Sequence, residues 1–380
     1  MKQIPMLDLK LEYDYMKEEI NTAINKCFEH QQWILGPEVK ELESKIGQYL
    51  GTKHCIGVSS GTDALVLSLR AIVIKLRGQE YFNPKDEIIT TSFTFTATGD
   101  AILRAKAKPV FVDIDKETYN IDPSKIRKYL AKHDKVVGII PVHLYGQACN
   151  MDEIMQIAAE YNLFVVEDVA QAFGSMWKQK KLGSIGTTGV FSFFPSKNLG
   201  SYGDAGMVAT NDDATAELVR ILMKHGGKDK YNVDHIGYNA RLDTIQASVL
   251  LAKIKYIDEF NERRRKIAEF YNENLKRVKG IKLPKSLLDG YHAYHQYTIR
   301  VLNGKRDELS KHLKEQGIAT MVYYPIPLHK MKVFEGKMKV AGKQKVAEKA
   351  AEEVLSLPIE PLFKQKDLNI VVETVKGFFK

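Results

Sequence analysis

Residues 191–200, FSFFPSKNLG, join an apolar run to a lysine, and this junction decides how the rest of the chain is interpreted. The run beginning at Phe191 is typical of a buried strand, and Pro195 ends it, so Lys197 emerges directly from the interior of a sheet. A lysine shielded from water has a lowered pKa, and its neutral amine is a nucleophile. The ordinary alternative, in a lysine-rich chain, is a solvated loop lysine after a strand. The rest of the sequence is needed to distinguish a buried, nucleophilic lysine from a solvated one.

Six further apolar runs resemble this strand, and helical patterns separate most of them. They are, in chain order, HCIGVSS, DEIITTS, KPVFVDID, KVVGIIPVHL, LFVVEDVA and GMVATND. Nearly continuous Val, Ile and Phe runs between helices predict an α/β protein with a mostly parallel, seven-stranded sheet sandwiched by helices. Ligands of such sheets bind beyond the carboxyl ends of the strands, where SSGTDA, TTSFTF, EDVAQ and PSK all occur.

The last third of the chain predicts a second, smaller unit. A charged helical pattern from about Arg241 to Val278 is interpreted as a connector, and the mixed patterns after it predict a small α+β domain. We therefore expect three parts. They are an N-terminal segment (1–40) that packs on the small domain, a large α/β domain (41–250), and a connector helix with a C-terminal α+β domain (251–380).

Composition excludes several classes of protein. The chain has 380 residues, of which 44% are hydrophobic and 27% charged, as expected of a globular protein. Without a signal-peptide core or an apolar run of membrane-spanning length, we expect a cytoplasmic protein. Cys27, Cys55 and Cys149 lie far apart, which favours free thiols over disulfides or a metal site. The net charge of +9 is scattered among acids, so no nucleic-acid surface is predicted.

Two of the strand ends carry groups that suit a charged ligand. Ser60, Gly61 and Thr62 open a helix, where free backbone N–H groups and the positive helix end suit a phosphate. An ordinary helix cap is the alternative. Glu167 and Asp168 end the strand of LFVVEDVA, and because neighbouring strand residues face opposite sides, one of them can meet a given ligand. A carboxylate there could pair with a protonated ring nitrogen.

A ring-stacking residue completes the set. In TTSFTFTAT, Phe93 or Phe95 could stack on a flat ring, and at least one of them is expected in the core. A phosphate cradle, a ring stacker, a buried acid and a desolvated amine together fit pyridoxal 5'-phosphate, whose aldehyde forms a Schiff base with a lysine. Other signatures fail, since GSYGDAG lacks the GxGxxG spacing and no GxxxxGK[ST], HExxH or GxSxG occurs. No metal site is predicted.

Ordered motifs along nearly the whole chain resemble one family. SSGTDAL, FVDIDKETYNIDP, IIPVHLYGQACNMD, VVEDVAQAFGS, FSFFPSKNLGSYGDAG and GYNARLDTIQA are similar to landmarks of the DegT/DnrJ/EryC1/StrS family. These are pyridoxal-phosphate-dependent nucleotide-sugar aminotransferases of fold type I. The resemblance implies a homodimer whose subunits share their active sites.

The resemblance also implies individual roles. Lys197 would form the Schiff base, Asp168 would pair with the pyridine nitrogen, and Gln171 would contact the phenolic oxygen of the cofactor. Phe95 would stack on the ring. The phosphate contacts would be Gly61, Thr62, Ser192 and, from the other subunit, Asn239.

The resemblance further implies a substrate. L-glutamate would donate the amino group and leave as 2-oxoglutarate, and a nucleotide-linked keto sugar would receive it for surface polysaccharide or glycan biosynthesis. The segment MVYYPIPLHK resembles members that act on UDP-3-keto-hexuronates and dTDP-3-keto-6-deoxyhexoses, so we favour a C3 ketone. Tyr323, Tyr324 and His329 are possible sugar contacts.

Arg241 could bind a carboxylate or form a structural salt bridge. A C4-keto substrate is the alternative, and a sugar dehydratase is disfavoured because Lys197 is intact. Phe173 stands where many members have histidine, and we expect it to alter packing near the cofactor or sugar.

Overall fold

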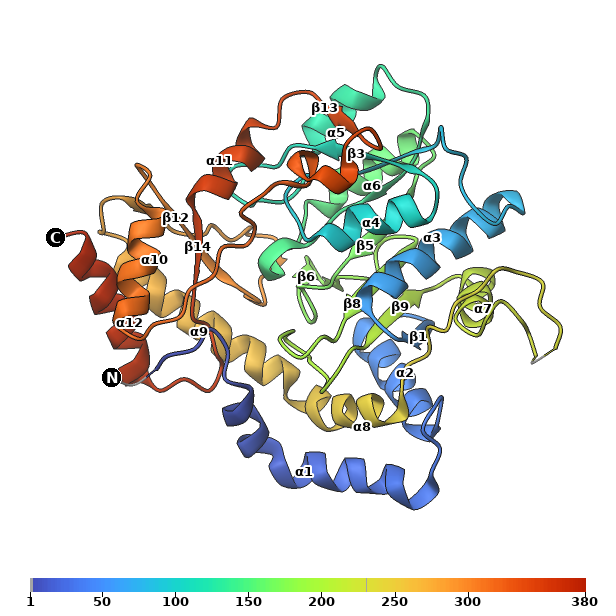
Figure 1. Cartoon of the computed structure of the whole chain (residues 1–380), viewed down its shortest axis with the longest axis horizontal. Helices are drawn as coiled ribbons and strands as arrows, with labels where there is room; N and C mark the ends of the chain where they lie inside the picture. Colours follow the sequence, from blue (N-terminus) through green and yellow to red (C-terminus); the bar gives the residue numbers. More distant parts are fainter. Residues whose placement is uncertain (1–2, 230) are drawn as a thin grey trace.

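An eight-stranded sheet forms the centre of the computed structural model, which describes residues 3–229 and 231–380 (Figure 1). In spatial order its strands are β1 (His54–Val58), β9 (Gly206–Thr210), β8 (Thr188–Ser192), β5 (Phe164–Asp168), β4 (Val136–Ile140), β2 (Glu87–Thr91), β3 (Lys108–Val112) and β13 (Lys339–Ala341). In this sheet β9 runs antiparallel to both of its neighbours, β1 and β8, and all the other neighbouring strands are parallel. All seven predicted strands are present, so the mostly parallel α/β sheet is confirmed.

The eighth strand, β13, was not predicted. It comes from the C-terminal part of the chain and pairs with β3, with Val340 opposite Phe111. Its three residues lie in a charged segment without an apolar run, so the sequence pattern carried no strand signal.

Helices cover both faces of the sheet, as predicted. One face packs against α2 (Pro37–Leu50), α5 (Pro123–Leu130), α6 (Met151–Glu160) and α8 (Thr244–Lys253). The other packs against α3 (Gly61–Arg77), α4 (Thr96–Arg104) and α7 (Asp213–Leu222). Because β-strand side chains alternate between faces, Val165 belongs to the first of these cores and Val166 to the second.

The connector is divided into two helices. The expected continuous pattern becomes α8, a 3₁₀ turn η2 (Ile254–Tyr256) and α9 (Ile257–Leu275). Leu250 of α8 lies in a core of the large sheet, whereas Tyr271 of α9 lies in the core of the C-terminal unit. The break therefore falls where the chain passes from one core to the other.

The C-terminal unit is built on a second, antiparallel sheet. This sheet contains β10 (Ile281–Lys282), β12 (Tyr297–Val301) and β14 (Val354–Leu357), and its helices are α10 (Arg306–Glu315), α11 (Lys345–Glu353) and α12 (Gln365–Phe378). A third small sheet joins β11 (Gly290–Tyr291), β6 (Met176–Trp177) and β7 (Lys180–Lys181). The short 3₁₀ turns are η1 (Leu144–Gly146), η3 (Leu328–Lys330) and η4 (Lys332–Phe334).

The N-terminal segment contacts more than the expected small domain. Ile4 exchanges backbone hydrogen bonds with Gly317 and Ala319 of the C-terminal unit. Helix α1 (Leu9–His30), however, lies along α8, where Met16 and other apolar residues pack together with Val249 (Figure 1). The segment thus bridges both parts of the chain.

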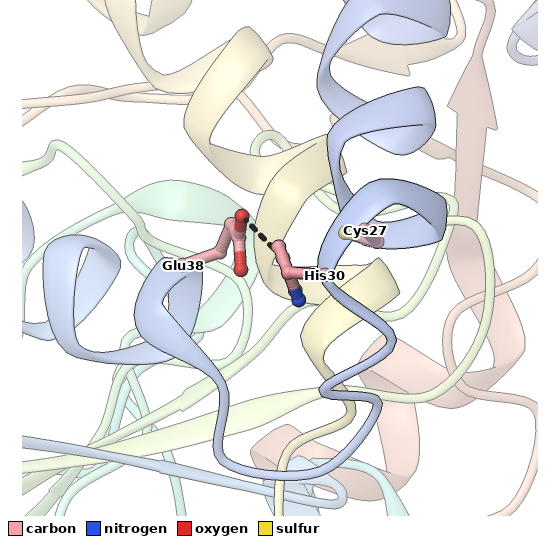
Figure 2. Close-up of side chains that lie close together, drawn as sticks. All are labelled: Cys27, His30 and Glu38. Atoms are coloured by element: carbon pink, nitrogen blue, oxygen red, sulfur yellow. Dashed lines mark hydrogen bonds and ion pairs between the residues drawn. The ribbon is translucent and has the colours of Figure 1, made fainter.

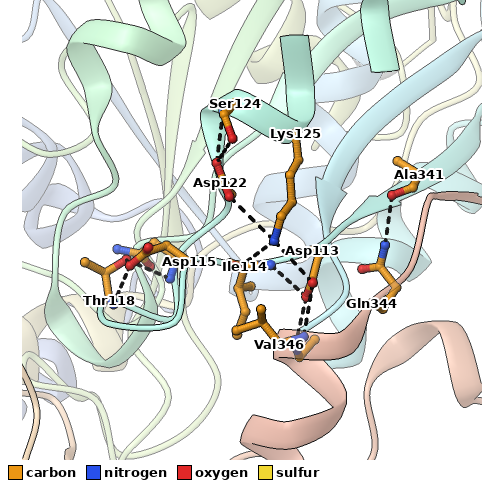
Figure 3. A network of polar contacts seen from close by, with 12 residues as sticks. Asp113, Ile114, Asp115, Thr118, Asp122, Ser124, Lys125, Ala341, Gln344 and Val346 are labelled. Carbon is orange, nitrogen blue, oxygen red and sulfur yellow. Dashed lines mark hydrogen bonds and ion pairs between the residues drawn. The ribbon is translucent and has the colours of Figure 1, made fainter. Parts of the chain in front are cut away.

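A polar network attaches the C-terminal chain to β3 (Figure 3). The carboxylate of Asp113, just after β3, accepts hydrogen bonds from the backbone N–H groups of Val346 (3.1 Å) and Ala347 (2.8 Å) in the first turn of α11. Lys125 of α5 donates to the same carboxylate (3.2 Å). A negative group at a helix start is stabilising, so Asp113 fixes α11 beside the large sheet.

None of the described helices has the length and apolar character needed to span a membrane.

Candidate active site

A cavity of about 490 Å³ opens beyond the carboxyl ends of β5 and β8, next to the start of α3. This is the edge of the sheet where the sequence predicted a ligand. Its lining residues include Ser60, Gly61, Thr62, Thr94, Phe95, Thr98, Asp168, Gln171, Ser192, Phe194, Lys197, Asp204, His295, Gln296, Tyr323 and Tyr324.

Lys197 reaches this cavity from the turn that follows β8. The turn is closed by a hydrogen bond from the Lys197 N–H to the Phe194 carbonyl (2.8 Å). Loss of hydration lowers the pKa of the Lys197 amine to about 8, although the Asp168 carboxylate opposes this shift. A neutral, nucleophilic amine is therefore accessible near neutral pH, unlike that of a solvated loop lysine.

The two carboxylates at the end of β5 point to opposite faces. Asp168 lines the cavity, accepting hydrogen bonds from the Thr98 hydroxyl (2.8 Å) and the Ala170 N–H (3.1 Å). Burial raises the pKa of Asp168, while the bond from Thr98 opposes the increase. Glu167 lies on the other side, fully buried, with its hydrogen bonds inside the protein. Asp168 is thus the carboxylate that can meet a ligand.

The start of α3 forms one wall of the cavity together with β8. Ser60 caps the helix by accepting a hydrogen bond from the Asp63 N–H (3.0 Å), which leaves the N–H groups of Gly61 and Thr62 directed out of the helix end. Ser192 lies so close that a Cβ on Gly61 would be 2.7 Å from the Ser192 Cβ. Only glycine fits this approach, and the result is a small cradle suited to an anion.

Aromatic rings form the wall opposite the sheet. Phe95 is 56% exposed and lines the cavity, whereas Phe93 is fully buried in the core. The Tyr324 ring lies 6.3 Å from that of Phe95, and its hydroxyl accepts a hydrogen bond from Gln171 (2.8 Å). Tyr323 also lines the cavity.

Three residues named from the sequence lie outside this lining. Asn239 is exposed and accepts hydrogen bonds from Arg241 (3.0 Å from Nε) on the segment before α8. His329 in η3 pairs with Glu348 of α11 (3.1 Å). Their proposed ligand contacts stay predictions.

Other lining residues were missed from the sequence. Thr98 holds Asp168, and His295, in the loop before β12, faces the cavity from the C-terminal unit. Thr98 is the last residue of TTSFTFTAT, but that motif was interpreted only for its two phenylalanines, and His295 lies in no motif that indicates chemistry. Patterns within short segments cannot predict that residues 98, 168 and 295 line one cavity.

Phe173 is absent from the cavity lining. It is stacked on Tyr49 (ring centroids 5.5 Å apart) and packs against Phe191 and Phe193 beneath the sheet. The expectation that Phe173 alters packing near the cofactor or sugar stays a prediction.

A cluster of potential metal ligands lies elsewhere, at the end of α1 (Figure 2). The Cys27, His30 and Glu38 ligand atoms lie within 4.8 Å of one another. The His30 Nδ1 accepts the Gln32 N–H (3.0 Å), so its ring proton is on Nε2, which contacts Glu38 (3.1 Å). A metal would need that Nε2 lone pair, so this hydrogen-bonded arrangement does not fit metal binding.

Comparison with known proteins agrees with this geometry. Residues 14–376 match the DegT/DnrJ/EryC1/StrS aminotransferase family. The chain belongs to this family. The resemblance seen in the sequence motifs, and the prediction of an aminotransferase, are therefore confirmed.

Several curated relatives are similar over almost their full length. The chain is 46% identical to the "Pleiotropic regulatory protein" of Geobacillus stearothermophilus, covering 99% of both chains. It is 41% identical to the "dTDP-3-amino-3,6-dideoxy-alpha-D-galactopyranose transaminase" of Aneurinibacillus thermoaerophilus, covering 99% of each. It is 40% identical to the "UDP-2-acetamido-2-deoxy-3-oxo-D-glucuronate aminotransferase" of Pseudomonas aeruginosa, covering 97% of this chain and 98% of the relative.

The structural comparison confirms the fold and the cofactor. NtdA from Bacillus subtilis, solved with bound cofactor PMP, superposes with a TM-score of 0.89 at 32% identity, covering 100% of this chain and 86% of NtdA. This aminotransferase uses pyridoxal 5'-phosphate, as the sequence predicted. The residues present fit this cofactor. At Gly61 there is no room for a side chain, which leaves the backbone N–H groups open to a phosphate, and the Asp168 carboxylate lines the cavity as a hydrogen-bond acceptor.

Proposed function

We propose that this aminotransferase moves an amino group from L-glutamate to the C3 ketone of a nucleotide-linked sugar. The observation that carries this proposal is that Lys197 and Asp168 line the same cavity, with the pKa of the lysine lowered to about 8. The C3 preference is supported by the two relatives whose names specify 3-oxo and 3-amino sugars. A C4 ketone is the alternative.

Each group of the cavity has a separate task in this proposal. When bound, pyridoxal 5'-phosphate supplies an electron-accepting ring. The N–H groups of Gly61 and Thr62, with the Ser192 hydroxyl, bind its phosphate, and Asp168 pairs with the ring nitrogen. Lys197 would hold the aldehyde group of the cofactor, and its free amine would accept and return the proton that moves during transfer.

The remaining groups orient the ring and the sugar. Phe95 stacks on one ring face and Gln171 approaches the phenolic oxygen. Tyr323 and Tyr324 border the space left for the sugar. His329 and Arg241 are proposed as outer contacts, and Arg241 would bind a carboxylate of donor or substrate.

The experiment mixes the cofactor-loaded protein with glutamate and then with a panel of keto-sugar nucleotides. A change in the visible absorption band with glutamate, reversed by one sugar whose product gains an amine by mass, would support the proposal. Lys197→Ala is the matched inactive control. No spectral response to any amino donor would rule the proposal out.

We also infer that two copies share their active sites. Asn239 is exposed and paired with Arg241 outside the cavity of its own chain, as expected of a group offered to a neighbour. Mixing inactive Lys197→Ala with Asn239→Ala should restore activity, because mixed dimers combine an intact lysine with an intact asparagine. If Asn239 acts within its own chain, mixing restores nothing.

A further inference from the structure

Lys197 takes its position from an irregular segment, residues 193–200, which we call the lysine loop. The loop begins directly after β8 and contains no helix or strand. Within it, the Lys197 N–H closes a turn by donating to the Phe194 carbonyl (2.8 Å). Leu199 attaches the loop to the core of the large sheet, where its side chain is buried. The placement of the amine therefore depends on what else holds this loop.

Asn198, the residue directly after Lys197, uses its whole amide to contact other elements. Its Nδ2 donates to the Asn261 Oδ1 (2.7 Å) on α9 and to the Ala293 carbonyl (3.2 Å) in the loop before β12. Its Oδ1 lies 3.0 Å from the Nδ1 of His295, in the same loop. Only 7% of the Asn198 surface is exposed, so little water can compete for these hydrogen bonds.

Neighbouring groups determine which way the Asn198 amide points. Asn261 is fully buried and donates its own N–H to the Phe173 carbonyl (3.1 Å), so its oxygen is the atom that faces Asn198. That oxygen and the Ala293 carbonyl both accept hydrogen bonds, and only the amide nitrogen of Asn198 can donate to them. The Asn198 oxygen is thereby directed to His295, and both ends of the amide have a defined partner.

These bonds make Asn198 the connection between the lysine loop and the C-terminal part of the chain. Among the described residues, no other side chain of the lysine loop has a hydrogen bond to α9 or to the loop before β12. Leu199 thus fixes the lysine loop to the sheet, and Asn198 fixes it to the elements on the other side. A buried side chain held by several hydrogen bonds also restrains its own backbone, and Lys197 is the adjacent residue.

We propose that Asn198 is a positioning residue for Lys197, because it joins the lysine loop to α9 and to the loop before β12 and so fixes where the lysine side chain begins. A lysine has a flexible four-carbon stem, so an amine that accepts and returns a proton at one place needs a fixed backbone. The inference deepens the proposed function and rests on its assignment of proton transfer to Lys197.

The first test measures the ionisation of the amine without any sugar. Cofactor-free protein is modified with pyridoxal over a range of pH, and Lys197 is located by borohydride reduction and peptide mass analysis. Burial is the main cause of the lowered pKa of Lys197, so a loosened loop that admits water should move the midpoint of Asn198→Ala above about 8. An unchanged midpoint would overturn the proposal. A label on another lysine would instead remove the proposed role of Lys197.

The second test acts on Asn198 from a distance. Asn261→Ala removes one acceptor of the Asn198 amide, although Asn261 belongs neither to the lysine loop nor to the cavity lining. The midpoint should move in the same direction by a smaller amount. The double variant with Asn198→Ala should shift no further than Asn198→Ala alone, because both changes break the same hydrogen bond. Additive shifts would show that Asn261 acts by another route and would contradict the proposal.

A matched control lies on the same helix. Asn274 of α9 donates its side-chain N–H to the Phe270 carbonyl (2.9 Å), so Asn274→Ala also removes an asparagine hydrogen bond from α9. The midpoint of Lys197 should stay unchanged in this variant. A shift equal to that of Asn261→Ala would show that the amine responds to any loss of stability in α9, which would overturn the proposal.

Kinetics separate positioning from stability. In the cofactor-loaded enzyme, Asn198→Ala should lower kcat by about 10- to 100-fold with little change in KM for the amino donor, as expected for a misplaced catalytic group. A lower thermal stability with midpoint and kcat preserved would show a structural role and overturn the proposal. If no keto sugar reacts with the unaltered enzyme but the midpoints behave as expected, the substrate assignment fails and the role of Asn198 stands.

Discussion

Glu167 and Asp168 are adjacent buried carboxylates at the end of β5, yet the two faces of the sheet use them differently. The carboxylate of Glu167 accepts hydrogen bonds from backbone N–H groups of the 183–186 turn, with N to O distances of 2.8 to 3.0 Å. Its Oε2 lies 3.2 Å from the His143 Nε2. Asp168 accepts two hydrogen bonds and faces the cavity beside Lys197. Burial is common to both, so it does not mark the functional acid. What distinguishes the functional acid is a carboxylate that faces a cavity and can still accept a hydrogen bond from a ligand there.

The largest expected effect comes from the cavity side. Asp168→Asn removes the negative charge that would pair with the ring nitrogen, so transaminase activity should fall by about 10²- to 10⁴-fold. The folded protein should be no less stable at pH 7, because burial raises the pKa of Asp168 and its charged form therefore disfavours folding above its unfolded pKa. Activity assays and thermal unfolding of the same preparation check both statements. A large loss of stability would place Asp168 with Glu167 as a structural acid.

The opposite pattern is expected on the other face. Glu167→Gln replaces one acceptor oxygen by an amide nitrogen that faces backbone donors, so the free energy of unfolding should fall by about 1–3 kcal/mol. Activity per folded molecule should change little, because no Glu167 atom reaches the cavity lining. Denaturant unfolding measures the first and active-site titration the second. Selective loss of activity at full stability would contradict the division between the faces.

The sequence predicted the regular part of this site and missed the part that loops supply. Strand and helix periodicities placed Lys197, Asp168 and Gly61 at one sheet edge, since the carboxyl ends of parallel strands meet there. Because side chains alternate along a strand, the sequence indicated that Glu167 and Asp168 face opposite sides of the sheet. The family resemblance then implied that Asp168 is the one that meets the ligand. His295 could not be found this way, because its place depends on how the C-terminal unit docks on the sheet. The same docking explains the missed strand β13.

A smaller effect is expected at the phosphate cradle, also on the cavity side. In Gly61→Ala the new Cβ would meet the Ser192 Cβ at 2.7 Å, and such crowding costs about 1–3 kcal/mol. We expect cofactor affinity to fall by about 10-fold, since 1.4 kcal/mol corresponds to tenfold in binding. Gly377→Ala in α12 is the matched control, because its Cβ would have no neighbour within 4 Å. Fluorescence titration with pyridoxal phosphate compares them, and equal affinities would argue against phosphate binding at Gly61.

The smallest expected change is a shift in the ionisation of Lys197, and it tests both carboxylates at once. The amine reacts only when unprotonated, so modification by pyridoxal should reach half its maximum rate near the pKa of about 8. The Asp168 charge raises the pKa of Lys197, so Asp168→Asn should move this midpoint to lower pH, making the amine more reactive at pH 7. Glu167→Gln should leave the midpoint unchanged, because that carboxylate faces away from the cavity. Equal midpoint shifts in both variants would show that the Glu167 charge influences Lys197 as strongly as the Asp168 charge does. The two carboxylates would then differ only in which groups they contact.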